Sequence, residues 1–221
     1  KHTVEFGAKY IDRDMTSQYS TWDEGDFTQP YEQFAYNQKV TSGYVSTKWE
    51  LNKNWGMVAG LRGEHTQISG QWNQQISGEW VQNEKDTFQN DYLTILPNLI
   101  FSYKIDMMQS LKFSYSKRLS RPGIYYINTN SLANDILNIE KGNPYLKPST
   151  SHNLEIGYNN FSGKYKGSYY LFAKHSTNLI EPIVTMNGDT AVTNYENLSE
   201  NNSVGINYYG SISINNLDLR A

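Results

Sequence analysis

The chain has 221 residues, a formal net charge of −3 and no cysteine. The lack of cysteine excludes a disulfide scaffold, a thiol enzyme and a cysteine-ligated zinc site. The balance of 19 basic and 22 acidic residues excludes nucleic-acid binding through bulk positive charge. No stretch approaches the roughly 18 consecutive apolar residues of a transmembrane helix. The 18 tyrosines, 16 glycines and many asparagines and serines favour strands and turns.

Apolar and polar residues alternate with a period of two in eight segments, which predicts strands rather than helices. In chain order, the predicted strands are residues 4–10, 39–51, 55–69, 91–103, 110–120, 153–158, 165–176 and 203–214. The fourth strand illustrates the pattern, because its apolar side contains every second residue from Leu93 to Tyr103. The seventh strand, 165–176, is compatible with either phase.

Short and long connections alternate between these strands. The short ones are residues 52–54, 104–109 and 159–164, and the long ones are 11–38, 70–90, 121–150 and 177–202. Compact soluble domains rarely contain several structureless loops longer than about 12–15 residues. Short turns on one rim and long loops on the other are typical of outer-membrane barrels. We therefore expect an all-β fold, an antiparallel up-and-down transmembrane β-barrel of which this chain forms about eight strands.

Aromatic residues lie where such a barrel would place its interfacial girdles. Trp49 and Trp55 flank the shortest turn, and Tyr10, Tyr92 and Tyr115 lie towards the other rim. On the apolar side of 91–103, Pro97 lacks a backbone N–H and predicts a bulge or local distortion.

Four short motifs occur in a fixed order along the second half of the chain. They are Tyr-Ser-Lys-Arg-Leu-Ser-Arg-Pro at 115–122, Gly-Asn-Pro-Tyr-Leu-Lys-Pro at 142–148, Asn-Leu-Glu-Ile-Gly-Tyr at 153–158 and Tyr-Glu-Asn-Leu at 195–198. Together they resemble the outer-membrane β-barrel region of TonB-dependent receptors of the Bacteroidetes type, most strongly over residues 90–214. The chain departs from that family at Ser149, where an acidic residue is common, and at Asn128-Thr129, where Asn-Pro is frequent.

The resemblance implies a barrel of roughly 22 strands that encloses a plug domain. It implies a receptor in the bacterial outer membrane that imports a scarce nutrient, such as a siderophore, a glycan or a peptide, with energy transmitted by TonB. Residues 1–221 are then expected to be a fragment of one barrel domain, cut out of a larger protein and without the plug domain that would contact TonB. The expected partners are outer-membrane lipid, TonB and the nutrient, with no cofactor and no resident metal.

Aromatic side chains on the long loops are the candidate ligand-binding residues, because aromatic platforms suit sugars, peptides and ring-bearing chelators. They are Trp22, Tyr31, Trp72, Trp80, Tyr125 and Tyr126. The alternative is that the loops use these rings to pack on themselves.

Charged residues on the polar sides of neighbouring strands form a second group. They are Arg62, Glu64, Lys112, Arg118 and Glu155. In a barrel the polar side lines the lumen, where these charges could contact a plug or a passing solute. The alternative is a solvated face with ordinary cross-strand ion pairs.

A soluble β-sandwich that binds carbohydrate is the alternative function, since period-two alternation also suits two packed sheets. In a barrel the apolar sides face lipid, whereas in a sandwich they meet inside. An enzyme is not expected, because the sequence lacks the His-Glu-x-x-His, Gly-x-Ser-x-Gly and phosphate-loop motifs. The four histidines, His2, His65, His152 and His175, are scattered along the chain and predict no metal site.

Overall fold

The computed structural model describes residues 1–19, 22–23, 26–27, 32–76, 79–129, 132–135, 137–214 and 217–220. Eight long strands dominate it: β1 (His2–Tyr19), β4 (Glu32–Glu50), β5 (Trp55–Ile76), β6 (Glu79–Lys104), β7 (Gln109–Ser120), β10 (Ser149–Asn160), β11 (Tyr165–Asn187) and β12 (Thr190–Ile214). The shorter elements are β2 (Trp22–Asp23), β3 (Asp26–Phe27), β8 (Leu132–Asp135), β9 (Asn138–Lys141), β13 (Leu217–Arg220) and the helix α1 (Ile124–Ile127). Among the described residues, no helix is long and apolar enough to span a membrane.

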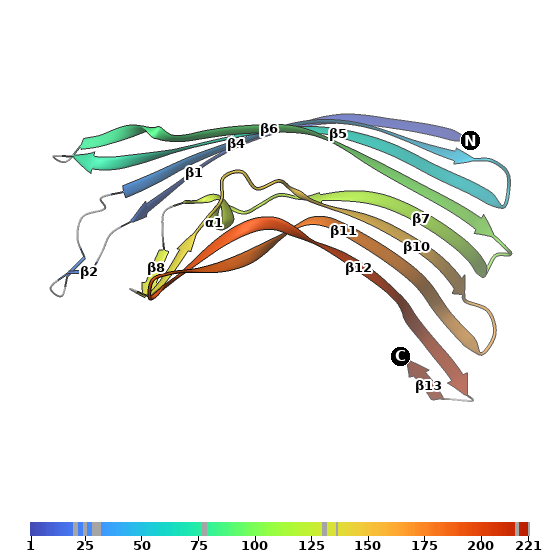
Figure 1. Ribbon diagram of the computed structural model, residues 1–221. Coiled ribbons are helices and arrows are strands. Elements are labelled where there is room, and N and C mark those ends of the chain that lie inside the picture. The colour runs from blue at the N-terminus through green and yellow to red at the C-terminus, as the bar shows by residue number, and fades with distance from the viewer. Residues whose placement is uncertain are drawn as a thin grey trace.

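The long strands form one curved, antiparallel, up-and-down sheet (Figure 1). Its order is β1-β4-β5-β6-β7-β10-β11-β12-β9-β8, and β13 also pairs with β12. Among the described strands β1 and β8 stand at opposite ends of this order, so the sheet is open. The prediction of eight consecutive strands in a partial barrel is confirmed, and the structure adds short strands at the margins.

The strands are longer than expected, and three of the four predicted long loops are largely strand. The β1–β4 ladder runs on to Tyr19 opposite Glu32, and the β5–β6 ladder runs on to Ile76 opposite Glu79. The β11–β12 hairpin ends in a two-residue turn where Gly188 has a φ of +62°. A tilted strand needs only about 9–11 residues to cross a bilayer. The extensions lie beyond the bilayer, where the outward face is polar and the apolar residues of β4, β5 and β6 lie on the concave face.

The register places the apolar residues of adjacent strands together on the convex, outward face. Along one row, Ala59 lies opposite Leu99, and Leu99 lies opposite Tyr115. The same pairing continues through Leu154, Ala173 and Val204, and so settles the phase of the seventh predicted strand. Several apolar side chains of the outward face are well exposed, with Val204 at 78% and Leu93 at 69%. The alternative of a sandwich is wrong, because the apolar face of this sheet covers its outside.

An aromatic girdle lies on the outward face beside the short turns, as predicted from Trp49 and Trp55. The ring of Trp55 lies 4.5 Å from that of Tyr103. Tyr158, Tyr169 and Tyr208 continue the girdle across β10, β11 and β12, with centroid distances of 6.1 and 4.9 Å. Such rings favour the membrane interface, so this rim marks the edge of the apolar band.

At the opposite rim the prediction is correct for two tyrosines and wrong for the third. Tyr10 and Tyr115 lie on the outward face. Tyr92 is adjacent to the outward Leu93 and therefore points inwards, half-buried opposite Thr66.

The bulge expected at Pro97 is absent, since the β5–β6 ladder passes through Pro97 opposite Leu61 without a shift in register. The β6–β7 ladder instead ends at Asn98 opposite Ser116. A proline cannot donate to a ladder, and we infer that the lost donor lies on the β7 side. Beyond this point β7 diverges from β6, which opens the sheet for the segment that follows β7.

Replacement of Leu99 by arginine places a charge on the outward face within the apolar band. We expect Leu99→Arg to reduce the free energy of folding into a bilayer by about 2–4 kcal/mol, because the guanidinium must be desolvated in lipid. Asn98→Arg is the matched control, because its side chain points to the lumen. Equal destabilisation of the two variants in a vesicle-folding titration would contradict the assigned faces.

Candidate ligand-binding site

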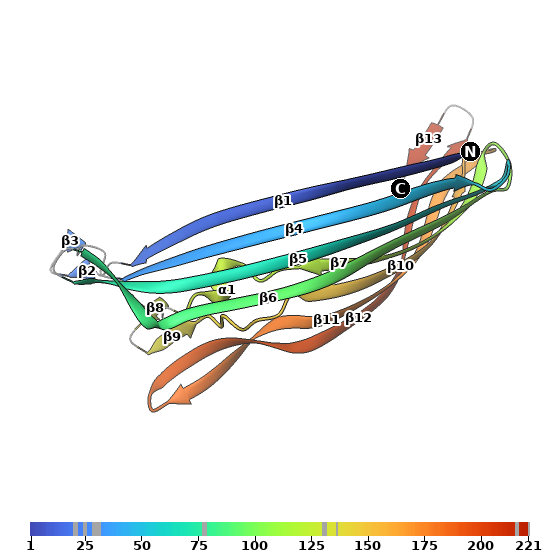
Figure 2. The same cartoon turned by 90° about the horizontal axis from the view of Figure 1, so that it is seen from above.

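The described parts of residues 121–148 lie on the concave side of the sheet, between strands β4–β6 and the β11–β12 hairpin (Figures 1 and 2). The segment contains α1, β8 and β9, and β9 pairs in parallel with β12 from Asn138 opposite Ala191 to Lys141 opposite Asn194. Its path is fixed by four sets of contacts.

The first contact is an ion pair at Arg121, the residue that follows β7. Its guanidinium binds Glu64 and donates to the Thr66 hydroxyl at 3.1–3.2 Å. Glu64 is only 5% exposed and also pairs with Arg62, with Nε 2.6 Å from Oε1. A buried carboxylate is stable only when it is paired. Glu64 therefore holds the start of the segment against β5.

The second contact is hydrophobic. Ile127, at the end of α1, is 2% exposed and packs into a cluster on the concave face. The cluster contains Phe34, Tyr36, Ile68, Trp72 and Phe88. The Phe34 and Trp72 rings stack with centroids 4.8 Å apart. Burial of Ile127 fixes α1 over the parts of β4, β5 and β6 that extend beyond the apolar band.

The third contact joins two of the sequence motifs. The Asn143 amide donates to the Tyr195 carbonyl at 3.0 Å. Asn197 accepts from the Lys147 N–H at 2.7 Å and donates to the Lys147 carbonyl at 2.9 Å. Two asparagines thus attach the 142–148 segment to β12, about 50 residues away in sequence.

The fourth contact closes the segment on itself at Gly142. Its N–H donates to the Asn128 carbonyl at 2.8 Å, and the Asn143 N–H donates to the Tyr126 carbonyl at 2.6 Å. A Cβ at Gly142 would lie 2.7 Å from the Asn128 nitrogen. Only glycine allows the two backbones to approach so closely.

Three tyrosines form an edge-to-face group beside this crossing. The rings of Tyr125, Tyr126 and Tyr195 lie 4.9–5.9 Å apart. The Tyr125 hydroxyl donates to Glu140 and accepts from Tyr195 at 3.4 Å. The hydrogen bond to Glu140, followed by that with Tyr195, raises the pKa of Tyr125 above its ordinary value.

A pocket of about 400 Å³ lies between the segment, the β5–β6 wall and β12. Its walls include Trp72, Phe88, Tyr145, Tyr195 and Glu196. Tyr145 is 72% exposed and is therefore free to contact a ligand. Aromatic faces with amides and a carboxylate at the margin suit a ring-bearing or sugar-like molecule.

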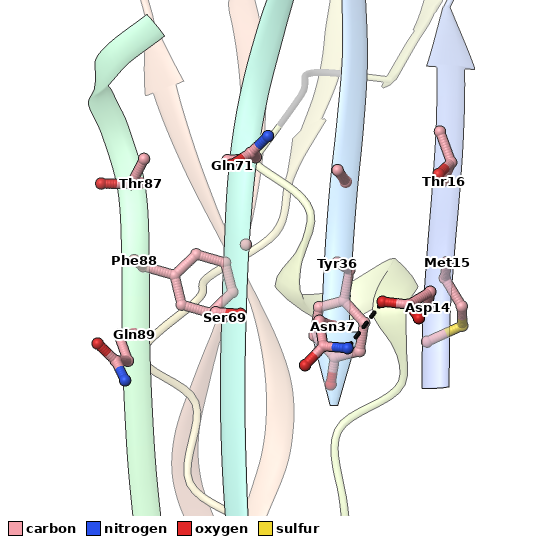
Figure 3. A pocket seen from close by; sticks show the side chains of 12 residues that line it. Asp14, Met15, Thr16, Tyr36, Asn37, Ser69, Gln71, Thr87, Phe88 and Gln89 are labelled. Carbon is pink, nitrogen blue, oxygen red and sulfur yellow. Dashed lines mark hydrogen bonds between the residues drawn. The ribbon is translucent and has the colours of Figure 1, made fainter. Parts of the chain in front are cut away.

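A second hollow, of about 380 Å³, involves β1, β4, β5 and β6 beyond the apolar band (Figure 3). Asn37 donates to Asp14 at 2.7 Å, and Gln71 and Gln89 lie beside them on the outward face. Their polarity agrees with a position outside the lipid. This hollow lies mainly on the convex side, whereas the aromatic pocket borders the concave side that forms the lumen, so the aromatic pocket is the better ligand site.

The structure brings three of the six predicted aromatics together. Trp72 lines the pocket, and Tyr125 and Tyr126 contact Tyr195, which also lines it. Trp80 lies opposite Gln75 near the tip of the β5–β6 hairpin. Trp22 belongs to β2, where only its backbone is described, and Tyr31 lies outside the described residues. Ligand binding by these residues stays a prediction.

All five predicted lumen charges lie on the concave face by register, but they do not form one cluster. Arg62 and Glu64 are paired with each other. Lys112 lies opposite Gly157, Arg118 opposite Ser151 and Glu155 opposite Ser114. Within the described part of the chain, no group of three or more His, Cys, Asp or Glu residues could hold a metal ion.

Arg121, Asn143, Tyr195 and Asn197 were not predicted to have roles in the site, although each lies within a quoted motif. Their positions in motifs were the available signal. Sequence spacing does not reveal that Asn143 meets Tyr195 and Asn197 meets Lys147, because these contacts depend on the path of the whole segment.

A model described as "Outer membrane protein beta-barrel family" matches residues 1–217. Among curated proteins, none matches the chain.

Several solved structures have the same fold. The copper transporter OprC has a TM-score of 0.71 at 10% identity, over 97% of this chain and 33% of its own. The hemophore receptor HasR of Serratia marcescens has a TM-score of 0.65 at 17% identity, over 96% of this chain and 40% of its own. The ferric yersiniabactin uptake receptor FyuA of Yersinia pestis has a TM-score of 0.62 at 14% identity, over 96% of this chain and 30% of its own. The chain thus spans 30–40% of the length of these proteins.

Replacement of Gly142 by alanine tests the inward path of the segment. We expect Gly142→Ala to displace residues 121–148, because its Cβ cannot fit against Asn128, and limited proteolysis to cut this segment faster. Gly123→Ala is the matched control, since a Cβ there meets nothing within 4 Å. Equal cleavage rates for the two variants would show that the backbones do not cross as described.

Titration of Tyr125 tests the tyrosine group. Because its pKa is raised, Tyr125 should keep its proton above the ordinary value of about 10. The associated stabilisation is fully present below that value and is lost as pH rises through the raised pKa. We expect Glu140→Gln to lower the pKa of Tyr125, measured as the ultraviolet titration difference between matched variants with and without Tyr125→Phe. An unchanged pKa would show that Glu140 is not its partner.

Proposed function

Because this chain belongs to the outer membrane protein β-barrel family, and therefore lies in the outer membrane, we propose that it forms part of a TonB-dependent receptor that binds and imports a scarce nutrient. In this proposal residues 1–221 are part of one barrel domain, and the plug domain that contacts TonB is supplied elsewhere in the protein. The motif series favours the Bacteroidetes type of these receptors.

The observation that carries the proposal is the inward-folded segment with its aromatic pocket. The segment occupies the concave side of the sheet, on the rim opposite the short turns, which is the extracellular rim in outer-membrane barrels. A ligand arriving from outside would reach Tyr145 and Trp72 before it entered the lumen. The aromatic residues that line the pocket favour a ligand with rings or sugar units, such as a siderophore, a glycan or a glycosylated peptide.

The polar concave face supports a transport role beyond binding. Arg62, Lys112, Arg118 and Glu155 would face the lumen below the pocket, along the path of a solute that leaves it. Receptors with this barrel fold include proteins named for heme, ferric yersiniabactin and copper. Those names describe the relatives, and we propose only that this chain shares their mode of import.

Growth on single nutrient sources tests the proposed function directly. A deletion strain should lose uptake of one compound from a panel of ferric siderophores, heme, glycans and peptides, and removal of TonB should have the same effect. Full uptake of every compound in the deletion strain, or uptake that is independent of TonB, would contradict it.

Tyr145→Ala tests the pocket once that compound is known. Loss of one exposed aromatic contact should weaken binding by about two- to tenfold, measured by calorimetry with the full-length protein. Tyr209→Ala is the matched control, because Tyr209 is similarly exposed at 63% and lies on the concave face at the other rim. Equal affinities for wild type and Tyr145→Ala would place the ligand elsewhere.

A further inference from the structure

A row of basic and hydrogen-bonding side chains lies on the outward face, immediately above the apolar band. Lys117 on β7 lies opposite His152 on β10, and His152 lies opposite His175 on β11. Asn202 on β12 completes the row opposite His175. Two histidines that are 23 residues apart in sequence thus become neighbours, with ring centroids 6.4 Å apart.

Hydrogen bonds hold both rings in place. The Tyr115 hydroxyl lies 2.8 Å from His152 Nδ1. The Asn202 side-chain oxygen lies 2.8 Å from His175 Nδ1. When the tyrosine donates to Nδ1 of a neutral imidazole, the ring proton lies on Nε2, which is then a donor. The row therefore presents one permanent positive charge and fixed imidazole edges.

Directly beneath the row lies an apolar groove of about 220 Å³. Leu154, Ala173 and Val204 line it, and they belong to the outward band already described. The rings of Tyr115, His152 and His175 form its upper margin. The groove is continuous with the lipid-facing surface, so a hydrocarbon chain is its natural occupant.

The other half of the rim has the opposite character. On β1, Asp12 and Asp14 both accept from Asn37. On β5 and β6, His65 pairs with Asp91 at 3.4 Å. Lys39 is exposed there but lies opposite Asp12. In the β7–β12 row, by contrast, Lys117 and two histidines are adjacent, and Glu200 follows two residues beyond Asn202.

We propose that Lys117 and the Nε2–H of His152 bind the phosphate of an anionic lipid in the outer leaflet, with one acyl chain in the groove below and His175, whose Nδ1 donates to Asn202, at the margin of the groove. The apolar band fixes the depth of the row at the headgroup level, and Lys117 supplies the complementary charge. Bound lipid would hold β7, β10 and β11 together at the point where β7 has separated from β6. This inference requires only the membrane location of the barrel, and it stands apart from the proposed nutrient.

Native mass spectrometry of the full-length protein in detergent tests this site, with lipid A and enzymatically dephosphorylated lipid A as probes. We expect wild type to bind lipid A more tightly than the dephosphorylated form. Lys117→Gln should lower lipid A affinity about fivefold, the effect of one surface charge, and should reduce the preference for phosphate. Lys117→Arg should restore both.

Lys39→Gln is the matched control, since it removes an exposed lysine of the outward face from the acidic half of the rim. We expect it to leave lipid A affinity unchanged, and millimolar inorganic phosphate should not displace the lipid. Equal binding of the two lipid probes would overturn the proposal. An equal effect of Lys39→Gln and Lys117→Gln, or displacement by inorganic phosphate, would also overturn it.

Discussion

The structure depends on one constraint, the absence of water around the backbone inside a bilayer. Every N–H and C=O in that layer must find a partner in the chain. The antiparallel ladders meet this requirement and force side chains to alternate between lipid and lumen. The same ladders then continue past the bilayer, so β5 and β6, with 22 and 26 residues, form a wall that stands in water. The concave face of these two strands contacts Arg121 and α1 of the inward-folded segment.

A buried carboxylate on β5 attaches the start of the inward-folded segment, and the packing of Ile127 attaches α1. Glu64 would be costly to bury alone, and Arg62 and Arg121 compensate it. Because Arg121 follows β7 directly, the ion pair determines where the segment begins. The β6–β7 ladder ends beside Pro97, at Asn98 opposite Ser116, and we attribute this end to the N–H donor that proline lacks. The pocket is therefore a consequence of strand geometry, and its aromatic residues come from β5, β6, residues 142–148 and β12.

The alternation of apolar and polar residues was sufficient to predict the strands and most of their outward faces. The eight strands, the outward faces of all but the seventh, and the Trp49–Trp55 girdle follow from residue order within one strand. Strand ends were missed because Asn37, Gln71 and Gln89 make the outward face polar beyond the membrane, and the apolar residues there, such as Tyr36 and Trp72, lie on the concave face instead. The inward orientation of Tyr92 was implied by the outward Leu93, whereas a position near a rim suggested an interfacial role. The Asn143–Tyr195 and His152–His175 contacts require the register across strands, which one sequence does not specify.

The central claim, that one face of this sheet meets lipid and the other meets water, can be measured directly because the native chain has no cysteine. Spin labels on single cysteines from residue 92 to residue 101 would report access to oxygen, which enriches in lipid, and to a water-soluble nickel chelate. The account predicts that odd positions in β6 respond to oxygen and even positions to nickel, with a period of two. Uniform access along β6, or the opposite phase, would contradict it.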